Sequence, residues 1–112
     1  MFWGTGKPKR EVTYIDDLAE AILVLMMSKN MDFLINIGSG YEKNISQYAK
    51  IISKELGYKG KIIFNQNKKL DGTPRKIVSS TKIKKLGWKS KTNFSQGLKL
   101  TVKDFLKKIN IN

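Results

Sequence analysis

The chain has 112 residues, with no cysteine and no histidine, and its 22 lysine and arginine residues outnumber 9 aspartate and glutamate residues to leave a net charge of +13. This length supports one apolar core, so we expect a single domain over residues 1–112 and not a two-domain enzyme. The two missing residue types exclude disulfides, thiolate nucleophiles, histidine-based catalytic triads and the usual zinc sites, so we expect no metal.

The positive charge is compatible with a small basic nucleic-acid-binding module, because such a surface attracts polyanions. Only Arg10 and Arg75 are arginine, however, and the lysines are scattered from Lys7 to Lys108. Modules that recognise nucleic acids depend on arginine forks and stacked aromatic rings. The pattern therefore favours a solvated, lysine-rich surface, with nucleic-acid binding as the alternative.

The sequence shows no sign of a membrane or secretory protein. No apolar run approaches the roughly 20 residues that a membrane-spanning helix needs, and the first residues lack the basic start and long apolar core of a signal peptide. We therefore expect a cytoplasmic protein with no membrane partner.

The first half of the chain predicts two strands and two helices. Residues 11–15 alternate as a short strand does, and Asp16 or Asp17 can cap a helix that ends near residues 28–30. The apolar residues of that helix recur at helical spacing, and we expect them to form its buried face: Leu18, Ala21, Ile22, Leu25 and Met26. Residues 34–37 predict a buried strand that ends at the turn 38–40, and Ser46 is expected to cap a second helix that stops at Gly57. The apolar stripe of the second helix contains Ala49, Ile52 and Leu56, flanked by Tyr48 and Ile51.

The second half predicts a third strand over residues 61–65 and an irregular loop over residues 66–76. A short helix follows from Ser80 or Thr81 to Leu86, with Gly87 as its stop, and Ser95 is expected to cap the last helix. The buried stripe of the last helix is expected to contain Leu98, Val102, Phe105, Leu106 and Ile109. This order predicts a small α/β domain of about three short strands packed with helices.

Two glycine pairs are reminiscent of phosphate-binding motifs, but neither pattern is complete. After Gly4 and Gly6, and again after Gly38 and Gly40, the third glycine of a dinucleotide fingerprint is replaced by a lysine, at Lys9 and Lys43 respectively. The sequence therefore predicts no dinucleotide site in this chain.

A group of side chains near the start and in the irregular loop suits a nucleotide sugar: Trp3, Lys7, Arg10, Asp71 and Arg75. Tryptophan can cover a sugar or base, arginine can bind phosphate oxygens with two donors, and a carboxylate accepts hydrogen bonds from hydroxyls. Each residue also has a structural alternative. Trp3 can be a packed aromatic, Arg10 can pair with Glu11 or Asp17, and Asp71 can be the turn residue before Gly72.

Two segments of the chain resemble a known family. Residues 3–19 resemble the segment that opens the substrate half of extended short-chain dehydrogenases acting on nucleotide sugars. A second run is similar to the C-terminal part of the GDP-L-fucose synthase subfamily, namely Asp71-Gly72-Thr73-Pro74-Arg75-Lys76, followed by Leu86-Gly87-Trp88. That subfamily is NADPH-dependent and converts GDP-4-keto-6-deoxymannose to GDP-L-fucose by epimerisation and reduction.

The resemblance implies that Trp3 contacts the substrate, that Arg10 binds its diphosphate and that Asp71 accepts hydrogen bonds from the nucleotide sugar. In that family the NADP(H) site and the catalytic residues lie in an N-terminal Rossmann half. We therefore expect this chain to be a C-terminal substrate-binding fragment with no catalytic or cofactor-binding residues of its own, inactive alone.

A fragment of this kind is expected to expose an apolar patch around Phe2, Trp3 and one face of the helix after Asp17, and to pair with the missing half or self-associate. Other nucleotide-sugar epimerases or dehydratases remain alternatives, because Lys9, Thr13 and Ser79 depart from the family's usual residues. A stand-alone scaffold that binds a partner through this patch is a further alternative.

Overall fold

The computed structural model describes residues 1–29 and 34–109 and divides the chain into two compact units. The first unit contains Met1–Arg10, Lys43–Lys76 and Ser95–Asn112, and the second contains Glu11–Glu42 and Ile77–Phe94. Each unit therefore joins segments that are distant in sequence. That residues 1–112 act as one substrate-binding domain stays a prediction.

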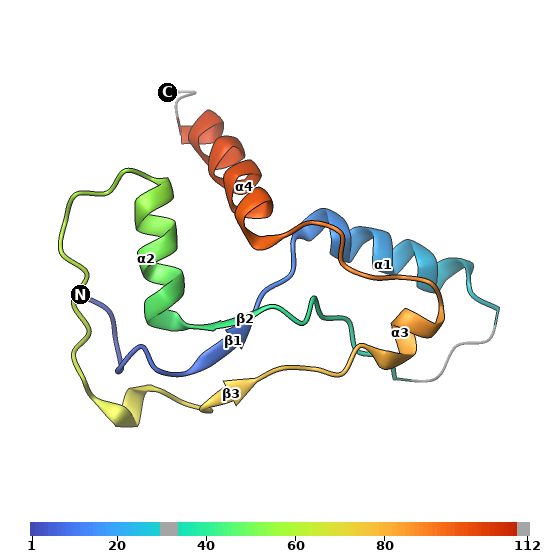
Figure 1. Ribbon diagram of the computed structural model, residues 1–112, viewed down its shortest axis with the longest axis horizontal. Helices are drawn as coiled ribbons and strands as arrows, with labels where there is room; N and C mark the ends of the chain where they lie inside the picture. The colour runs from blue at the N-terminus through green and yellow to red at the C-terminus, as the bar shows by residue number, and fades with distance from the viewer. Residues whose placement is uncertain (30–33, 110–112) are drawn as a thin grey trace. The chain divides into compact units, whose positions relative to one another are not determined.

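The described elements confirm the predicted class, a small α/β fold with short strands (Figure 1). In chain order they are β1 (Lys9–Glu11), α1 (Ile15–Met27), β2 (Glu42–Asn44), α2 (Ile45–Glu55), the 3-10 helix η1 (Lys68–Leu70), β3 (Arg75–Lys76), α3 (Thr81–Lys85) and α4 (Phe94–Ile109).

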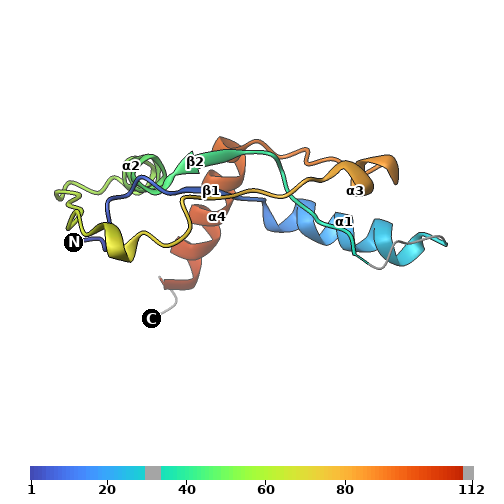
Figure 2. The same cartoon turned by 90° about the horizontal axis from the view of Figure 1, so that it is seen from below.

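Three strands of the described chain form one sheet in the order β2-β1-β3, and they stay side by side in both views (Figures 1 and 2). β1 and β3 are parallel, with Lys9 opposite Arg75 and Arg10 opposite Lys76. The number of strands matches the prediction, but their positions do not, since β1 shares only Glu11 with the strand expected at 11–15. The loop expected at 66–76 contains η1 and β3. Strands of two or three residues are too short to show the alternation by which sequence patterns reveal a strand.

The strand predicted at residues 34–37 is wrong, because these residues belong to no strand. The turn that follows is held by side chains instead of a strand ladder. The hydroxyl of Ser80 accepts a hydrogen bond from the Gly38 backbone N–H (2.9 Å) and donates one to the Gly38 carbonyl (2.8 Å). The hydroxyl of Thr13 accepts the N–H of Ser39 at 3.1 Å. Side-chain groups thus satisfy backbone positions that a neighbouring strand would otherwise pair.

The strand predicted at residues 61–65 reduces to a single parallel bridge between Phe2 and Phe64. The Phe2 N–H donates to the Ile63 carbonyl at 2.7 Å, and the Phe2 carbonyl accepts from the Asn65 N–H at 3.1 Å. The rings of Phe2 and Phe64 stack with their centroids 5.3 Å apart. This bridge ties the start of the chain to the segment before η1.

Helix α1 is found where it was expected, but its cap differs. The N-cap residue is Tyr14, whose side chain makes no capping hydrogen bond. Asp17 does not cap the helix, because its carboxylate accepts hydrogen bonds from residues 90–92 instead.

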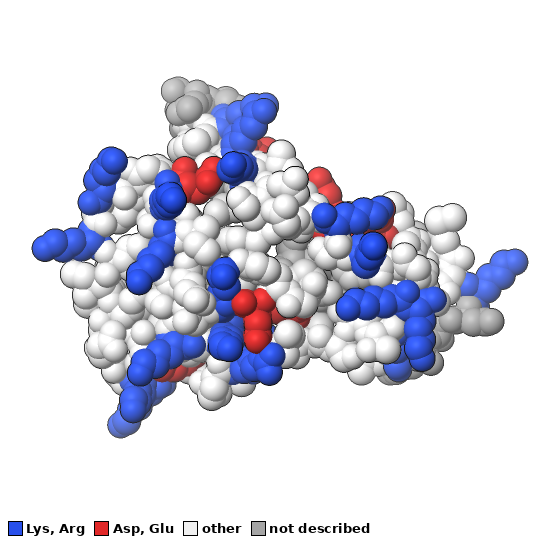
Figure 3. Space-filling view, viewed as in Figure 1, with Lys and Arg blue, Asp and Glu red and all other residues white. Residues whose placement is uncertain are grey.

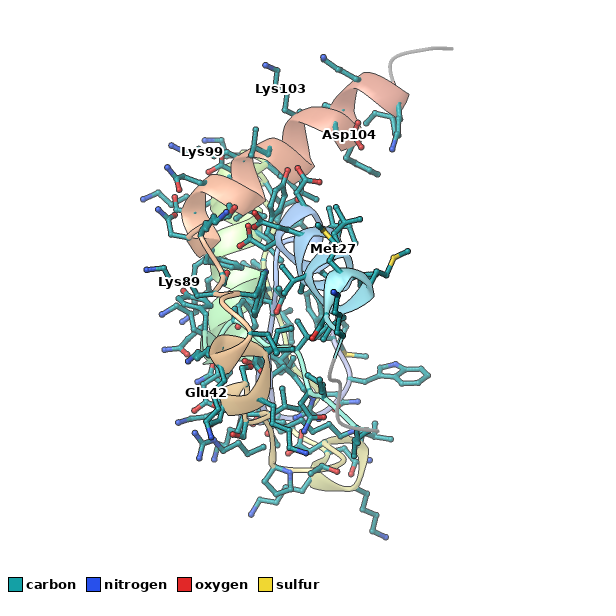
Figure 4. The ribbon with its side chains drawn as sticks, turned by 90° about the vertical axis from the view of Figure 1, so that its right-hand side faces the viewer. Met27, Glu42, Lys89, Lys99, Lys103 and Asp104 are labelled. Carbon is teal, nitrogen blue, oxygen red and sulfur yellow. The ribbon has the colours of Figure 1, made fainter. Side chains whose placement is uncertain are left out.

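The buried face of α1 was only partly predicted. Ala21 is fully buried with Ile83 and Trp88 in the core of the second unit, and further side chains pack against these three: Val24, Leu25, Ile35, Ile37 and Leu86. Ile22 and Met26, predicted to be buried, are 47% and 75% exposed. They lie with other exposed apolar residues of α1, namely Ile15, Leu23 and Met27, and Met27 points away from the helix (Figure 4). The helix is apolar nearly all round, so helical spacing alone did not distinguish its two faces.

The caps of α2 and α4 also differ from prediction. Asn44 caps α2 through a capping box with Gln47, so Ser46 lies within the first turn and donates to the Asn44 side chain at 2.8 Å. Gly57 ends α2 with φ +64°, as predicted. Helix α4 begins at Phe94, which places Ser95 inside it.

The apolar stripes of α2 and α4 are less buried than predicted. Tyr48 is the buried residue of α2. Its hydroxyl is satisfied there, since it donates to the Arg10 carbonyl at 2.9 Å and accepts the Lys43 N–H at 3.1 Å. Ile52 and Leu56 are exposed, as are three residues of the predicted α4 stripe: Phe105, Leu106 and Ile109. Among the described residues, no helix combines the length and apolar character needed to cross a membrane.

Candidate functional site: a turn that carries Trp3 beside the Asp71 loop

The segment around Trp3 is a tight turn in the first unit. Gly4 and Gly6 have φ values of +76° and +73°, a region that favours glycine. The Gly4 N–H donates to the side-chain oxygen of Asn65 at 2.9 Å. A Cβ atom at Gly4 would lie 2.5 Å from the Asp71 Oδ1 atom, so this position also has no room for a side chain. The indole of Trp3 is 79% exposed at the edge of this turn, which contradicts the alternative of a packed aromatic.

Asp71 joins the irregular loop to this turn. Its Oδ1 atom accepts the Thr5 backbone N–H at 2.6 Å, and its Oδ2 atom accepts the Thr5 hydroxyl at 2.7 Å. Asp71 follows η1 and precedes Gly72, whose φ is +67°, so it is also the turn residue that the sequence allowed. One residue therefore ends η1 and anchors a segment 66 positions earlier in the chain.

The electrostatics of this contact favour an ionised carboxylate. The hydrogen bonds from the Thr5 hydroxyl and N–H, aided by the charges of Lys7 and Lys68, hold the pKa of Asp71 below its ordinary value of 3.8 against partial desolvation. A carboxylate offers about four lone-pair sites, and Thr5 occupies two of them. Asp71 thus keeps capacity to accept hydrogen bonds from a ligand.

Arg10 lies on β1 and contacts the same loop at Thr73. Its Nη1 atom donates to its neighbour's carbonyl, Lys9 O, at 2.7 Å and to the Thr73 carbonyl at 2.8 Å. No ion pair with Glu11 or Asp17 forms in the described chain; Glu11 instead accepts the N–H groups of Gly40 and Val78. One edge of the guanidinium is therefore held by backbone, and its Nη2 and Nε donors have no partner among the described residues.

The structure thus connects Arg10 and the turn that carries Trp3 to the loop that contains Asp71. Asp71 contacts Thr5, which is two positions from Trp3, and Arg10 contacts Thr73, which is two positions from Asp71. Three residues that complete this arrangement were not predicted: Thr5, Asn65 and Thr73. Their partners are more than 60 positions away, so no local sequence pattern pointed to them.

A separate cavity of about 480 Å³ lies in the second unit and contains none of the predicted residues. The turn 38–39, Lys84 and residues 87–90 line it. Its serine hydroxyls already donate within the protein, Ser39 to the Val12 carbonyl at 2.5 Å and Ser90 to Asp17 at 2.6 Å. Lys84 and Lys89 thus remain as its charged groups, and we assign it no ligand.

The glycine pairs do not fit a dinucleotide. At Gly4 and Gly6 the space of a side chain is filled by Asp71 and the Phe64 ring, so the turn packs on the protein itself and offers no cradle for a pyrophosphate. Residues 38–40 lead into β2, whereas a dinucleotide-binding turn leads directly into a helix.

The fold matches enzymes of one class. The chain superposes over 96% of its length on a UDP-glucose 4-epimerase from Thermotoga maritima, solved with UDP-glucose, with a TM-score of 0.85 and 33% identity, and it covers 35% of that chain. It also matches a GDP-mannoheptose C4 reductase from Campylobacter jejuni with NADP bound, over 91% of this chain and 33% of the other, with a TM-score of 0.74 and 33% identity. Over 91–96% of its length the chain therefore has the fold of one part of these nucleotide-sugar epimerases and reductases, and it covers about a third of each.

The sequence similarity extends to GDP-L-fucose synthases. The chain is 39% identical over 109 residues to the probable GDP-L-fucose synthase 1 of Oryza sativa subsp. japonica, covering 97% of this chain and 33% of the relative. This confirms the resemblance inferred from the sequence. The chain spans about a third of the length of the curated relatives that it matches. No protein-family model matches it.

Proposed function

We propose that this chain binds the GDP part of a GDP-sugar, as the substrate-binding part of an NADPH-dependent epimerase and reductase that converts GDP-4-keto-6-deoxymannose to GDP-L-fucose. The observation that carries the proposal is the anchored guanidinium of Arg10, whose Nη1 is held by the Thr73 carbonyl while two other donor atoms remain available beside the Asp71 loop. A guanidinium held in this way is suited to two-point binding of a diphosphate.

The three site residues have different roles in this proposal. Arg10 binds the diphosphate, and the exposed indole of Trp3 covers a flat face of the ligand. Asp71 accepts hydrogen bonds from the nucleotide sugar through the lone pairs that Thr5 does not use. Lys7, whose charge acts on Asp71, adds positive potential on the same turn.

NADP(H) is bound by residues outside these 112 in this proposal, because neither glycine pair fits a dinucleotide. The cofactor supplies the hydride, and this chain's residues only bind and orient the sugar nucleotide. We expect the purified chain not to oxidise NADPH when it is given the keto-sugar nucleotide. Oxidation above the buffer rate, in a preparation free of full-length enzyme, would contradict this expectation.

Calorimetric titration with GDP tests the binding proposal. Arg10→Ala is expected to weaken GDP binding by about 1.5 to 3 kcal/mol, the worth of hydrogen bonds to a charged group. The matched control is Lys103→Ala, which removes one positive charge from the exposed face of α4 (Figure 4). Equal affinities of Arg10→Ala and the unchanged protein would remove Arg10 from the site.

The same titration addresses the alternatives. Tighter binding of UDP than GDP would favour another nucleotide-sugar epimerase or dehydratase. Preference for a short oligonucleotide, with a steep salt dependence, would favour a nucleic-acid-binding module. On the face seen in Figure 3, lysine and arginine side chains lie among uncharged and acidic residues.

A further inference from the structure

We infer that Thr5 is a positioning residue of the candidate site: by holding both carboxylate oxygens of Asp71, it fixes the turn that carries Trp3 and the orientation of the Asp71 carboxylate. This inference rests on the proposed function, because it concerns how the same site is organised. Thr5 touches no ligand in this view and acts through its two neighbours.

The contact between Thr5 and Asp71 has two points. The backbone N–H donates to Oδ1 at 2.6 Å and the hydroxyl donates to Oδ2 at 2.7 Å. The same hydroxyl oxygen accepts the Lys7 backbone N–H at 3.2 Å. Thr5 is only 8% exposed, so water competes weakly for these groups. Two parallel bonds fix the rotation of the carboxylate, which one bond alone would leave free.

Backbone contacts on both sides of Trp3 hold it, the Phe2 bridge before it and the bonds of Gly4 and Thr5 after it. Its indole is 79% exposed, so packing contributes little to holding the ring. The backbone on its C-terminal side is held by the Gly4 N–H bond to Asn65 and by Thr5. Asn65 also accepts the Asn67 N–H at 3.1 Å, which links it to the start of η1. Loss of the Thr5 hydroxyl would leave the turn attached to the loop by fewer bonds on the side of Asp71.

Removing the Thr5 hydroxyl distinguishes a role in positioning the site from a role in stability alone. Thr5→Val keeps the shape and the backbone N–H bond but removes the hydroxyl, and Thr5→Ser restores it. The matched control is Thr101→Val, which removes a hydroxyl that donates to the Gly97 carbonyl inside α4, in the same unit. Two quantities are measured below the melting temperature of every variant: the Kd for GDP, and the fast depolarisation of tryptophan fluorescence. Trp88 is only 3% exposed and serves as the rigid reference against which motion of Trp3 is detected.

We expect Thr5→Val to raise the Kd for GDP about tenfold and to increase the amplitude of fast Trp3 motion, with Thr5→Ser and Thr101→Val close to the unchanged protein. A lower melting temperature of Thr5→Val with an unchanged Kd and unchanged Trp3 motion would overturn the inference. GDP binding that depends on Arg10 but not on Thr5 would remove the inference alone. Absence of saturable GDP binding by the unchanged chain would remove the proposed function and the inference together.

Discussion

The indole N–H of Trp88 donates a 3.0 Å hydrogen bond to the backbone carbonyl of Asp17, and it joins α1 to the segment that follows α3. The side chain of Asp17 strengthens the same junction. Its Oδ2 accepts the Ser90 hydroxyl at 2.6 Å and the N–H groups of Lys91 and Thr92, and its Oδ1 accepts the Thr92 hydroxyl at 2.9 Å. Asp17 is 5% exposed, so it is a buried carboxylate whose charge is stabilised by several donors.

Replacing Asp17 with asparagine is expected to destabilise the second unit by about 3 kcal/mol, because an amide NH₂ would face donors that now bind a carboxylate oxygen. The measurement is urea unfolding followed by Trp88 emission. Asp16→Asn is the control, since Asp16 is the exposed neighbour with the same charge in the first turn of α1. Equal losses for the two variants would show that the effect comes from helix charge alone.

The stability of both units is expected to fall at acid pH. Burial raises the pKa of Asp17, but the hydrogen bonds from Ser90, Thr92 and Lys91 outweigh it, so its pKa in the folded protein lies below 3.8. The pKa of Asp71 is lowered as well. The unfolded chain therefore binds more protons below about pH 4, and the stabilisation present above that pH is lost as the pH drops further.

A titration of Trp88 emission from pH 7 to pH 2 checks this pH dependence for the second unit. Asp17→Asn should flatten the acid limb, because it removes the group responsible. A limb of the same size in that variant would assign the acid sensitivity to other carboxylates.

Gly4→Ala is expected to cost more than Gly72→Ala. Both positions have positive φ, so an alanine carries a backbone penalty of about 1 kcal/mol at each. At Gly72 a Cβ meets nothing within 4 Å, whereas at Gly4 it would lie 2.5 Å from the Asp71 Oδ1 atom. Thermal unfolding measures the two costs. In an Asp71→Ala background the difference should shrink, and a difference that persists would show that the Asp71 contact is not its cause.

The cap of α2 provides a test of local structure. Asn44→Ala is expected to lower the stability of the first unit by about 1 kcal/mol, because the Asn44 side chain accepts the Gln47 N–H. The Gln47 side chain in turn accepts the Asn44 N–H. Ser46→Ala should cost less, because the Ser46 hydroxyl bonds only to the cap itself. The reverse order in thermal unfolding would restore Ser46 as the cap.

The exposed apolar face of α1 is expected to drive self-association once salt screens the net charge of +13. Replacing both Leu23 and Met26 with lysine should keep the chain monomeric in sedimentation velocity runs at about 0.5 M salt. At that ionic strength the screening length is about 5 Å. Leu100→Lys, on the exposed part of α4, is the control. Association that is unaffected by the α1 variant would place the contact elsewhere.

The sequence alone predicted the fold class, the approximate positions of the helices and the family. Helices such as α1 and α4 are long enough for their apolar spacing to be recognised, and the glycine stops Gly57 and Gly87 follow α2 and α3. The group of Trp3, Arg10 and Asp71 came from side-chain chemistry and from the resemblance, and its role in binding stays a prediction. What a residue type can do and how a long helix repeats are both local properties, so a single sequence reveals them.

Only the tertiary structure decided which residues pair with one another. The strands are two or three residues long and pair with strands that are distant in sequence. β1 and β3, for example, meet at Arg10 and Lys76, which are more than 60 positions apart. The hydrogen bonds between Thr5 and Asp71 also join distant parts of the chain. The carboxylate of Asp17 likewise binds residues 90–92 and does not cap its own helix. Such contacts form because folding brings distant donors and acceptors together away from water, and their energies depend on a geometry that no local pattern contains.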